Sequence, residues 1–311
     1  MTIKRSDIAK ELIPGLNAIF GTSYKSVDGE HTPLFEMTTS RRSFEEEVQL
    51  TGLGSAVTKP EGAAVTYDDA QEHYTARYIH ETIALGFIIT EEAVEDDLYD
   101  SFSKMRAQFL GRSMANTKQV KAADVFNNGF STAYAIGDGA AFFSASHPTI
   151  VGTNQSNTVA ADLSETTLES ALIALSNYRD DRGILISATA QKLCIPPALQ
   201  FTAFKILKSD LSTTPLTNVA GSENVSNRND TNALRSMGFF PKGHYVNHRF
   251  TDADAWFIGT DVPNGTKMFV RTKLQTGTEG DFDTGNMKYK ARERYSFGVS
   301  DWRAWYGSSG A

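Results

Sequence analysis

Two patterns in the sequence combine residue types that could carry out chemistry. Ser101 and Lys104 have the Ser-x-x-Lys spacing of a serine nucleophile beside a lysine, but the companion Lys-Thr-Gly motif is missing. This pattern also falls inside a predicted long helix. His244 and His248 are four residues apart, which on a helix is the spacing of two zinc ligands. The residues Tyr245-Val246-Asn247 favour a strand instead, which separates the two histidines by roughly 13 Å.

Two loop segments contain weaker candidates. His147 precedes Pro148, and a histidine in a loop can serve as a general base. No nucleophile or orienting carboxylate is evident near it, so we expect a turn residue. Asp281-Phe282-Asp283-Thr284-Gly285 is similar to the start of a calcium loop. Arg292 occupies the twelfth position, where calcium needs a bidentate glutamate, so we expect a surface turn.

Sequence motifs that bind cofactors are absent. The chain has no Gly-x-x-x-x-Gly-Lys-Ser/Thr loop, no Gly-x-Gly-x-x-Gly and no Gly-x-Ser-x-Gly elbow. Its single cysteine, Cys194, excludes a Cys-x-x-Cys zinc site and lies in an apolar run typical of a core. We therefore expect no catalytic residue, no cofactor-binding residue, no metal ligand and no enzyme activity.

The composition describes a folded and mildly acidic protein. Of the 311 residues, 40% are hydrophobic and 22% are charged, which argues against disorder. The net charge of −7 is unlike the basic excess of a freestanding nucleic-acid-binding domain. Residues 1–10 lack the apolar core of a signal peptide, and the longest apolar stretch, Ile83–Ile89, is too short to cross a bilayer. We expect a protein made in a reducing cytoplasm, with no membrane partner.

In the N-terminal third, the sequence predicts elements that have no hydrophobic core of their own. Residues 3–20 show helical spacing of apolar residues, broken at Pro14-Gly15, which predicts two short helices or a bent arm. Residues 21–33 are typical of a loop. Residues 44–78 have few large apolar residues and many turn formers, so we predict a long, thin β-hairpin. Such a hairpin must lie on another surface, in this chain or in another one.

A long helix at about 91–127 is the clearest predicted element. Thr90 is a suitable N-cap, and glutamates follow it in the first turns. Apolar residues then recur at steps of three or four until Asn127-Asn128-Gly129 ends the pattern. Gly111 is its weak point. A helix of this length would serve as a beam along which other elements lie.

The remaining sequence predicts a mixed module. We expect helices at 164–178, with Ser164 as N-cap, and at 198–207, strands at 184–186 and 192–195, and successive strands across 243–303. The fold class is therefore α+β. A small module of about residues 164–285 is embedded in a second module built around the long helix.

The order of these parts resembles the major capsid proteins of tailed bacteriophages, which have the HK97-type fold. The most specific match is the phrase Ala-Phe-Phe-Ser-Ala-Ser-His-Pro at 141–148, followed by Gly-Thr-Asn-Gln-Ser-Asn at 152–157. The segments at 88–92 and 295–305 are also similar to this family. The resemblance covers about residues 35–306.

The resemblance implies a division into an N-terminal arm (1–43), an E-loop hairpin (44–82), a P-domain with its spine helix (83–163), an A-domain (164–285) and C-terminal strands that return to the P-domain (286–311). It implies a subunit that assembles into hexamers and pentamers of an icosahedral shell around phage double-stranded DNA. Its partners would be other copies, a portal protein, scaffolding and decoration proteins where the phage has them, and DNA through weak non-specific contact. Its location would be the virion, after assembly in the cytoplasm of the host bacterium.

Charged residues of the arm and hairpin are the candidates for intersubunit contact: Arg41, Arg42, Glu45, Glu46, Lys59 and Glu61. A solvated hairpin edge explains each of them, taken singly, equally well. Some members of the family join their subunits by a Lys–Asn bond, for which Lys59 is the candidate lysine. No asparagine partner or assisting glutamate is recognisable, so we expect no cross-link. We also find no charged extension similar to a fused scaffolding domain, and expect a separate scaffolding protein or none.

Two alternatives remain open. An encapsulin-like compartment of a cell would have the same fold, although the long arm and the Ser-His-Pro phrase favour the phage family. A cytosolic hydrolase would use His147, or His244 with His248, and has little else in the sequence to support it.

Overall fold

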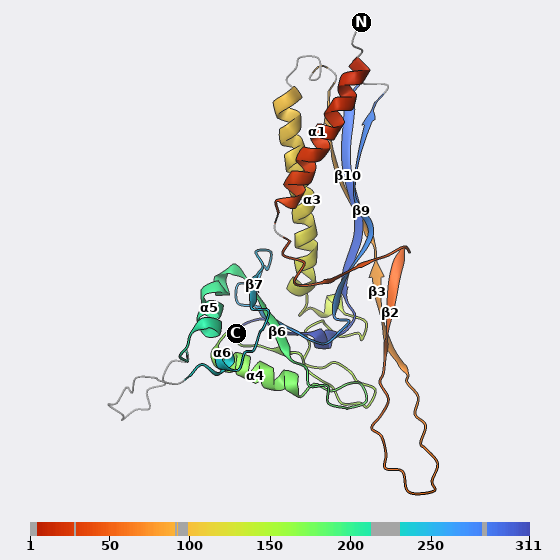
Figure 1. The fold of residues 1–311 in the computed structure, drawn as a ribbon, viewed down its shortest axis with the longest axis vertical. Coiled ribbons are helices and arrows are strands. Elements are labelled where there is room, and N and C mark those ends of the chain that lie inside the picture. The colour runs from red at the N-terminus through yellow and green to blue at the C-terminus, as the bar shows by residue number, and fades with distance from the viewer. Residues whose placement is uncertain (1–4, 28, 91, 93–98, 213–230, 282–284) are drawn as a thin grey trace, which may run out of the picture.

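The computed structural model describes residues 5–27, 29–90, 92, 99–212, 231–281 and 285–311. An elongated half of two helices and a long sheet stands above a small module, and a hairpin projects beyond both (Figure 1). The helices are α1 (Arg5–Lys25), α3 (Tyr99–Asn127), α4 (Glu165–Ser176), α5 (Gln200–Lys208) and α6 (Ala233–Ser236), with 3₁₀ turns at Thr132–Tyr134, Pro197–Leu199 and Trp302–Ala304. The strands are β1 (Glu36–Thr39), β2 (Phe44–Leu50), β3 (Glu72–Ile79), β4 (Glu81–Ile89), β5 (Thr158–Val159), β6 (Ala190–Ile195), β7 (His244–Val246), β8 (Trp256–Thr260), β9 (Thr266–Gly280), β10 (Met287–Val299) and β11 (Trp305–Ser308).

The elongated half is a four-stranded sheet with α1 and α3 on one face. Its strand order is β1-β9-β10-β4, and β10 pairs antiparallel with both β9 and β4. Neighbouring side chains of a strand point to opposite faces. On β10, Tyr289 and Ala291 are buried in a cluster with residues of α1 and α3, and Glu293 pairs with Lys118 of α3 at 2.5 Å. The odd-numbered residues of β10 therefore face the helices, and the even-numbered residues face away.

The helix α1 packs closely on α3, because Gly111 has no side chain. A Cβ atom at Gly111 would lie 2.8 Å from the carbonyl oxygen of Phe20. Leu16 and Phe20 of α1 fill the contact together with Leu110 and Met114 of α3. The residue that weakens the predicted helix is thus the one that lets a second helix approach it.

The small module is built on a five-stranded sheet with the order β5-β11-β8-β6-β7. Phe126, at the end of α3, is fully buried and links this module to the elongated half. Its ring lies 4.8 Å from that of Trp305, 5.2 Å from that of Phe257 and 5.6 Å from that of Phe142. One hydrophobic core therefore runs from the end of the long helix into the small module.

The hairpin consists of β2 and β3, which pair with each other in a separate two-stranded sheet, and of the loop 51–71 between them. Its base lies on the face of the long sheet opposite the helices. Tyr78 packs against Phe269 of β9, and a Cβ atom at Gly298 of β10 would lie 2.7 Å from the Tyr78 ring. Beyond this base the hairpin extends away from the body of the molecule (Figure 1).

Several predicted helices are confirmed, and two predictions for the N-terminal segment are wrong. The long helix ends at Asn127 as predicted; its predicted start, with the first turn after Thr90, falls on 91 and 93–98, outside the described residues. Ser164 caps α4 in a capping box with Thr167. The break at Pro14-Gly15 and the loop from residue 21 are wrong, because α1 is one helix to Lys25. Its packing on α3 outweighs the unfavourable local propensity.

Strand pairing corrects the predicted modules in three places. Residues 184–186 form no strand but a single bridge, Arg179 to Leu185. The predicted small module of 164–285 included β9, which instead pairs with β10 and β1 in the long sheet. The C-terminal segment 286–311 divides, because β10 joins the long sheet and β11 pairs with β8 in the small module. An alternating pattern identifies a strand but not its neighbours, so these assignments could not be made from it.

Candidate assembly interface

The hairpin loop carries large apolar side chains that the described chain does not cover. Leu53, Val57, Val65 and Tyr67 are exposed, and Tyr67 is 92% exposed. Fully burying a side chain of this kind stabilises by about 1.5–3 kcal/mol. A surface of another molecule that covered several of them would therefore gain a substantial free energy.

The hairpin base is held in place by buried and partly buried polar contacts. Lys267 of β9 lies 2.6 Å from Glu47 of β2, and the hydroxyl of Ser300 also donates to Glu47. The His80 ring lies between the hydroxyl oxygens of Ser40, at 2.8 Å, and Ser296, at 3.0 Å. These contacts fix the direction in which the hairpin leaves the body.

The four predicted contact residues at the base are exposed or partly exposed. Arg41 and Arg42 are exposed just before β2. Glu45 accepts a hydrogen bond from the hydroxyl of Ser40 at 2.7 Å. Glu46 is 3.7 Å from Nε of Arg77, in an exposed pair that is worth at most about 1 kcal/mol.

The other two predicted contact residues lie on the loop. Lys59 and Glu61 are exposed there, beyond the last paired residues of β2 and β3. The loop touches the small module near its own return, where Arg182 lies 3.5 Å from Asp68 and donates to the carbonyl of Asp69. The six candidates thus form two groups, one at the base and one on the loop.

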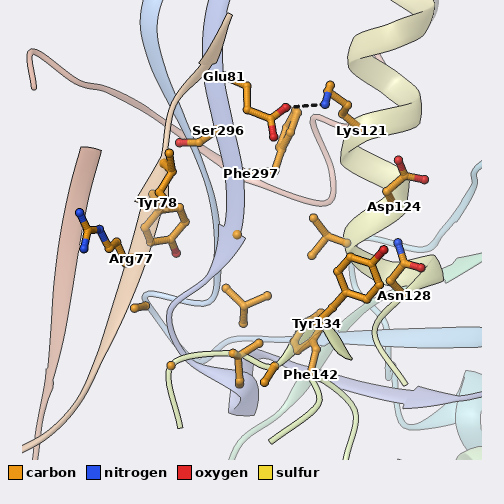
Figure 2. Close-up of a pocket in the computed structure, with 18 of the residues that line it drawn as sticks. Arg77, Tyr78, Glu81, Lys121, Asp124, Asn128, Tyr134, Phe142, Ser296 and Phe297 are labelled. Atoms are coloured by element: carbon orange, nitrogen blue, oxygen red, sulfur yellow. Dashed lines mark hydrogen bonds and ion pairs between the residues drawn. The ribbon is translucent and has the colours of Figure 1, made fainter. Parts of the chain in front are cut away.

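A cleft of about 740 Å³ is lined by residues of β3, α3 and β10. Figure 2 shows an ion pair between Glu81 and Lys121 in the lining of the cleft. The side chain of Phe297 lies beside Glu81, and those of Tyr134 and Phe142 lie close to each other in another part of the lining. Among the described strands, β3 pairs with β2 alone, so its second edge is free along this cleft. An unpaired strand edge beside a cleft is a further surface on which another chain can lie.

Exposed apolar side chains also occur on the body. Phe201 and Phe204 of α5 are one turn apart and exposed, as is Met237 just after α6. Phe109 of α3 and Leu85 of β4 line a shallow exposed groove between these two elements. Exposed large apolar side chains of this kind are candidates for contact with other molecules.

His147 is buried and forms a β-bridge with Gln155, so the prediction of a turn residue is wrong. Its Nδ1 lies 2.6 Å from Oδ2 of Asp138, its Nε2 lies 3.0 Å from Oδ1 of Asn157, and its ring stacks on Trp302 at 4.3 Å. The carboxylate that the sequence did not reveal is nine residues away and is brought in by the turn at 136–139. Both side chains of the His147–Asp138 pair are fully buried, so the pair fastens the loop to the body and has no surface for a substrate.

The other residues that the sequence suggested for chemistry lie in separate parts of the chain. Ser101 and Lys104 lie within α3. His244 begins the predicted strand, and Nδ1 of His248 lies 2.7 Å from Glu30. Asp281 pairs with Lys288 at 2.7 Å, whereas 282–284 lie outside the described residues.

Three further findings concern metal binding, the cysteine and the helices. In the described part of the chain, no three His, Cys, Asp or Glu side chains are grouped closely enough to hold a metal ion. Burial raises the pKa of the Cys194 thiol to about 12, which makes it unreactive in the folded chain. No helix in that same part is both long and apolar enough to cross a membrane.

The long sheet with its two helices, the small mixed module and the projecting hairpin define a capsid subunit of the HK97-type fold. The family described as phage capsid protein matches residues 74–308. This match covers most of the chain, and the chain therefore belongs to the phage capsid protein family.

Solved structures agree on the fold. The capsid of a native GTA particle is similar with a TM-score of 0.55 and 14% identity, covering 91% of this chain and 90% of that one. The procapsid of bacteriophage JBD30 is similar with a TM-score of 0.53 and 12% identity, covering 98% of this chain and 76% of that one. The SrpI encapsulin of Synechococcus elongatus PCC 7942 is similar with a TM-score of 0.51 and 10% identity, covering 91% of this chain and 88% of that one. A search of curated proteins gives no significant match.

Proposed function

We propose that this capsid protein is the major shell subunit of a phage head, which assembles into hexamers and pentamers of an icosahedral shell around double-stranded DNA. In this proposal its parts are those of the family: arm, hairpin, P-domain with the spine helix, and A-domain. A portal protein, and scaffolding or decoration proteins where the phage has them, are its further partners. The subunit is not an enzyme; it assembles in the host cytoplasm and remains in the virion.

The observation that carries the proposal is the hairpin. An isolated two-stranded hairpin is marginal in water, and this one exposes Val57 and Tyr67 instead of burying them. Its base is nevertheless fixed by partly buried contacts such as that of Lys267 with Glu47. A hairpin with a fixed base and an uncovered apolar loop is suited to contact another subunit.

The charge of the chain supports a container for DNA. With a net charge of −7, the subunit has no overall attraction for phosphate, and strong phosphate contacts would make release of the genome depend steeply on salt. Contact with the packaged DNA is therefore weak and non-specific.

A second candidate is an encapsulin-like compartment, favoured by the likeness to the SrpI encapsulin across 91% of this chain. The two functions differ in content, since a phage head holds DNA and a compartment holds protein. Nuclease-protected DNA in particles isolated from infected or lysogenic cells supports the phage head, and a co-purifying enzyme at fixed stoichiometry supports the compartment.

Light scattering and negative-stain imaging of the purified chain test the proposal. We expect shells, or rings of five and six subunits, with and without co-expressed scaffolding candidates. The matched control replaces the loop 51–71 by a short glycine turn, which leaves the described cores intact and should give folded monomers. Monomers of 34.1 kDa from the unaltered chain under every condition would contradict the proposal.

A further inference from the structure

The strand β4 has one unpaired edge. It is the last strand of the long sheet, and among the described strands it pairs with β10 alone. Residues 82–89 carry no charge, no proline and no bulge, and Leu85 and Ile88 are 47% and 49% exposed. Natural proteins protect a long apolar edge with such features or cover it, because a further strand otherwise adds to it. We therefore expect the edge of β4 to be covered in the assembled protein.

The even-numbered residues of β4 turn their backbone groups toward this edge. The carbonyl of Ile88 accepts a hydrogen bond from Nη1 of Arg106 at 2.9 Å, so it points away from β10. A Cβ atom at Gly86 would lie 3.4 Å from Cα of Lys290, its partner in register, which fits the short separation of a pair that is not hydrogen-bonded. Because hydrogen-bonded pairs alternate along an antiparallel ladder, the N–H and C=O groups of all even-numbered residues at 82–88 face the edge.

A groove beside the edge has room for the side chains of a further strand. It has a volume of about 320 Å³ and is lined by residues of β4 and α3, among them Leu85 and Phe109. Both of these side chains are exposed. Arg106 also lines the groove, is exposed, and has no carboxylate partner among the described residues. The groove thus combines an apolar centre with a positive charge near Ile88.

We propose that the edge of β4 pairs antiparallel with the edge of β4 in a second copy, about a two-fold axis at Leu85. In this register Leu85 lies opposite Leu85 of the second copy, Ala84 lies opposite Gly86, and Thr82 lies opposite Ile88. Edge-facing groups then meet edge-facing groups along the whole pair. The carbonyl of Ile88 has a second lone pair for its new partner, so the bond from Arg106 does not block it.

Charge selects a second copy as the occupant. In the same register, Glu81 lies opposite Ile89 of the second copy, one residue from the carbonyl that Arg106 of that copy binds. The side chain of Glu81 is 61% exposed, and its own chain supplies one partner, Lys121. The two-fold axis repeats the contact, so opposite charges flank an uncharged centre at both ends.

The proposed shell has a place for such a contact. An icosahedral shell contains two-fold axes between neighbouring rings of subunits, and a contact about a two-fold axis uses the same surface of both copies. The inference rests on the proposed function, and it adds the strand edge that lies at a two-fold axis.

A cysteine at the axis tests the pairing directly. In particles of full-length Leu85→Cys, formed alone or mixed with the unaltered chain, the Cα atoms of two such cysteines would be about 4.5 Å apart, which a disulfide can span. Mild oxidation should give dimers on a non-reducing gel and no larger ladder, since the native Cys194 is buried. Thr82→Cys is the matched control. Its two copies would lie roughly 20 Å apart and should stay single chains.

A proline at the edge tests the contribution of the hydrogen bonds. Ala84→Pro removes an N–H group that faces the edge, so the bonds between β4 and β10 remain, and an edge strand tolerates proline. The particle yield should fall at least about tenfold, because a carbonyl of the second copy loses its donor. The control, Ala84→Val, keeps the N–H group and should assemble normally. Circular dichroism and urea unfolding check that both variants are folded.

The outcomes separate this inference from the proposed function. Particles of Leu85→Cys that give no disulfide-linked dimer would overturn the pairing, and so would a normal particle yield of Ala84→Pro. A reduced yield of Ala84→Pro without any dimer of Leu85→Cys would assign the edge to a strand of a different molecule, which also overturns it. In each of these cases the unaltered chain still forms particles, and only its failure to do so contradicts the proposed function.

Discussion

The core at the end of α3 and the hairpin differ in what holds their side chains. Phe126 is fully buried, and its ring contacts the aromatic rings of Phe142, Phe257 and Trp305. Tyr67 on the hairpin loop is 92% exposed. Both are large side chains that a monomer would normally bury. Burial of the Phe126 ring stabilises the folded chain. Burial of the Tyr67 ring can stabilise only a contact with another molecule.

This difference separates two kinds of residue in one subunit. Changes in the core should lower the stability of the monomer and affect assembly only through it. Changes on the loop should leave the monomer intact and act on assembly directly. Measurements of unfolding and of particle formation on the same variants therefore test the division.

The largest effect on stability is expected for Phe126→Ala. Removing this ring leaves a cavity in the core that joins α3 to the small module, and should cost about 3–5 kcal/mol. Urea unfolding followed by fluorescence measures the loss. The control, Phe201→Ala, removes a ring that is 76% exposed and should change the free energy of unfolding by less than about 0.5 kcal/mol. Equal losses for the two variants would contradict the division.

The next largest effect on stability is expected for a buried ion pair. Arg303 is almost fully buried; its Nη2 lies 2.6 Å from Asp181, and Asp301 is 3.4 Å from its Nη1. Asp181→Ala leaves part of this charge uncompensated and should cost about 3 kcal/mol, at the low end of the range for broken buried pairs because Asp301 remains.

The hairpin supplies the matched comparison for this pair. Glu46→Ala breaks an exposed contact with Arg77 and should cost at most about 1 kcal/mol. Both variants are measured by urea unfolding at the same salt concentration. A loss for Glu46→Ala as large as that for Asp181→Ala would show that the hairpin base belongs to the core.

The junction between the two regions should be sensitive to acid. Burial, and then the charge of Arg294, lower the pKa of His80, which lies between Ser40 and Ser296. The unfolded chain therefore binds a proton more readily than the folded one. Stability is retained above the ordinary histidine pKa of about 6.5 and is lost as the pH falls below it.

The test compares urea midpoints at pH 7.5 and 5.5 for the unaltered chain and for His80→Gln. The variant should lose less stability on acidification than the unaltered chain. Burial also lowers the pKa of His31, which contacts Gln119, so part of the acid sensitivity should remain in the variant. An identical pH dependence of the two chains would exclude His80 as a contributor.

The sequence predicted those parts of the fold that local signals define. Ser164 as a helix cap and Asn127 as a helix end follow from capping preferences, which act within a few residues. The membership of β9 in the long sheet could not be predicted, because its partners β1 and β10 are set by tertiary packing. The contact of His147 with Asp138 was missed for a similar reason, since a turn places them together.

For the exposed surfaces, the sequence identified the hairpin but not which faces of the body stay uncovered. The alternation Lys-Tyr-Lys-Ala-Arg-Glu-Arg at 288–294 is visible in the sequence and predicts a strand with one basic face. Whether that face is covered depends on where α1 and α3 pack. Which residues of β4 lie beside it depends on the register with β10, which is about 200 residues away along the chain.

The smallest effect on monomer stability is expected for Tyr67→Ala, and this variant separates the two regions most sharply. Its ring contributes little to the folded chain because it is 92% exposed, so the free energy of unfolding should change by less than about 0.5 kcal/mol. If the ring is buried on a neighbouring copy, its loss should raise the concentration needed for assembly at least about tenfold, which corresponds to about 1.4 kcal/mol. Light scattering against protein concentration measures this threshold. Tyr67→Phe, which keeps the apolar surface and removes only the hydroxyl, should assemble close to normally. An unchanged threshold for Tyr67→Ala would leave the exposed loop without a role in assembly, and the apolar residues of α5 would then be the next surface to test.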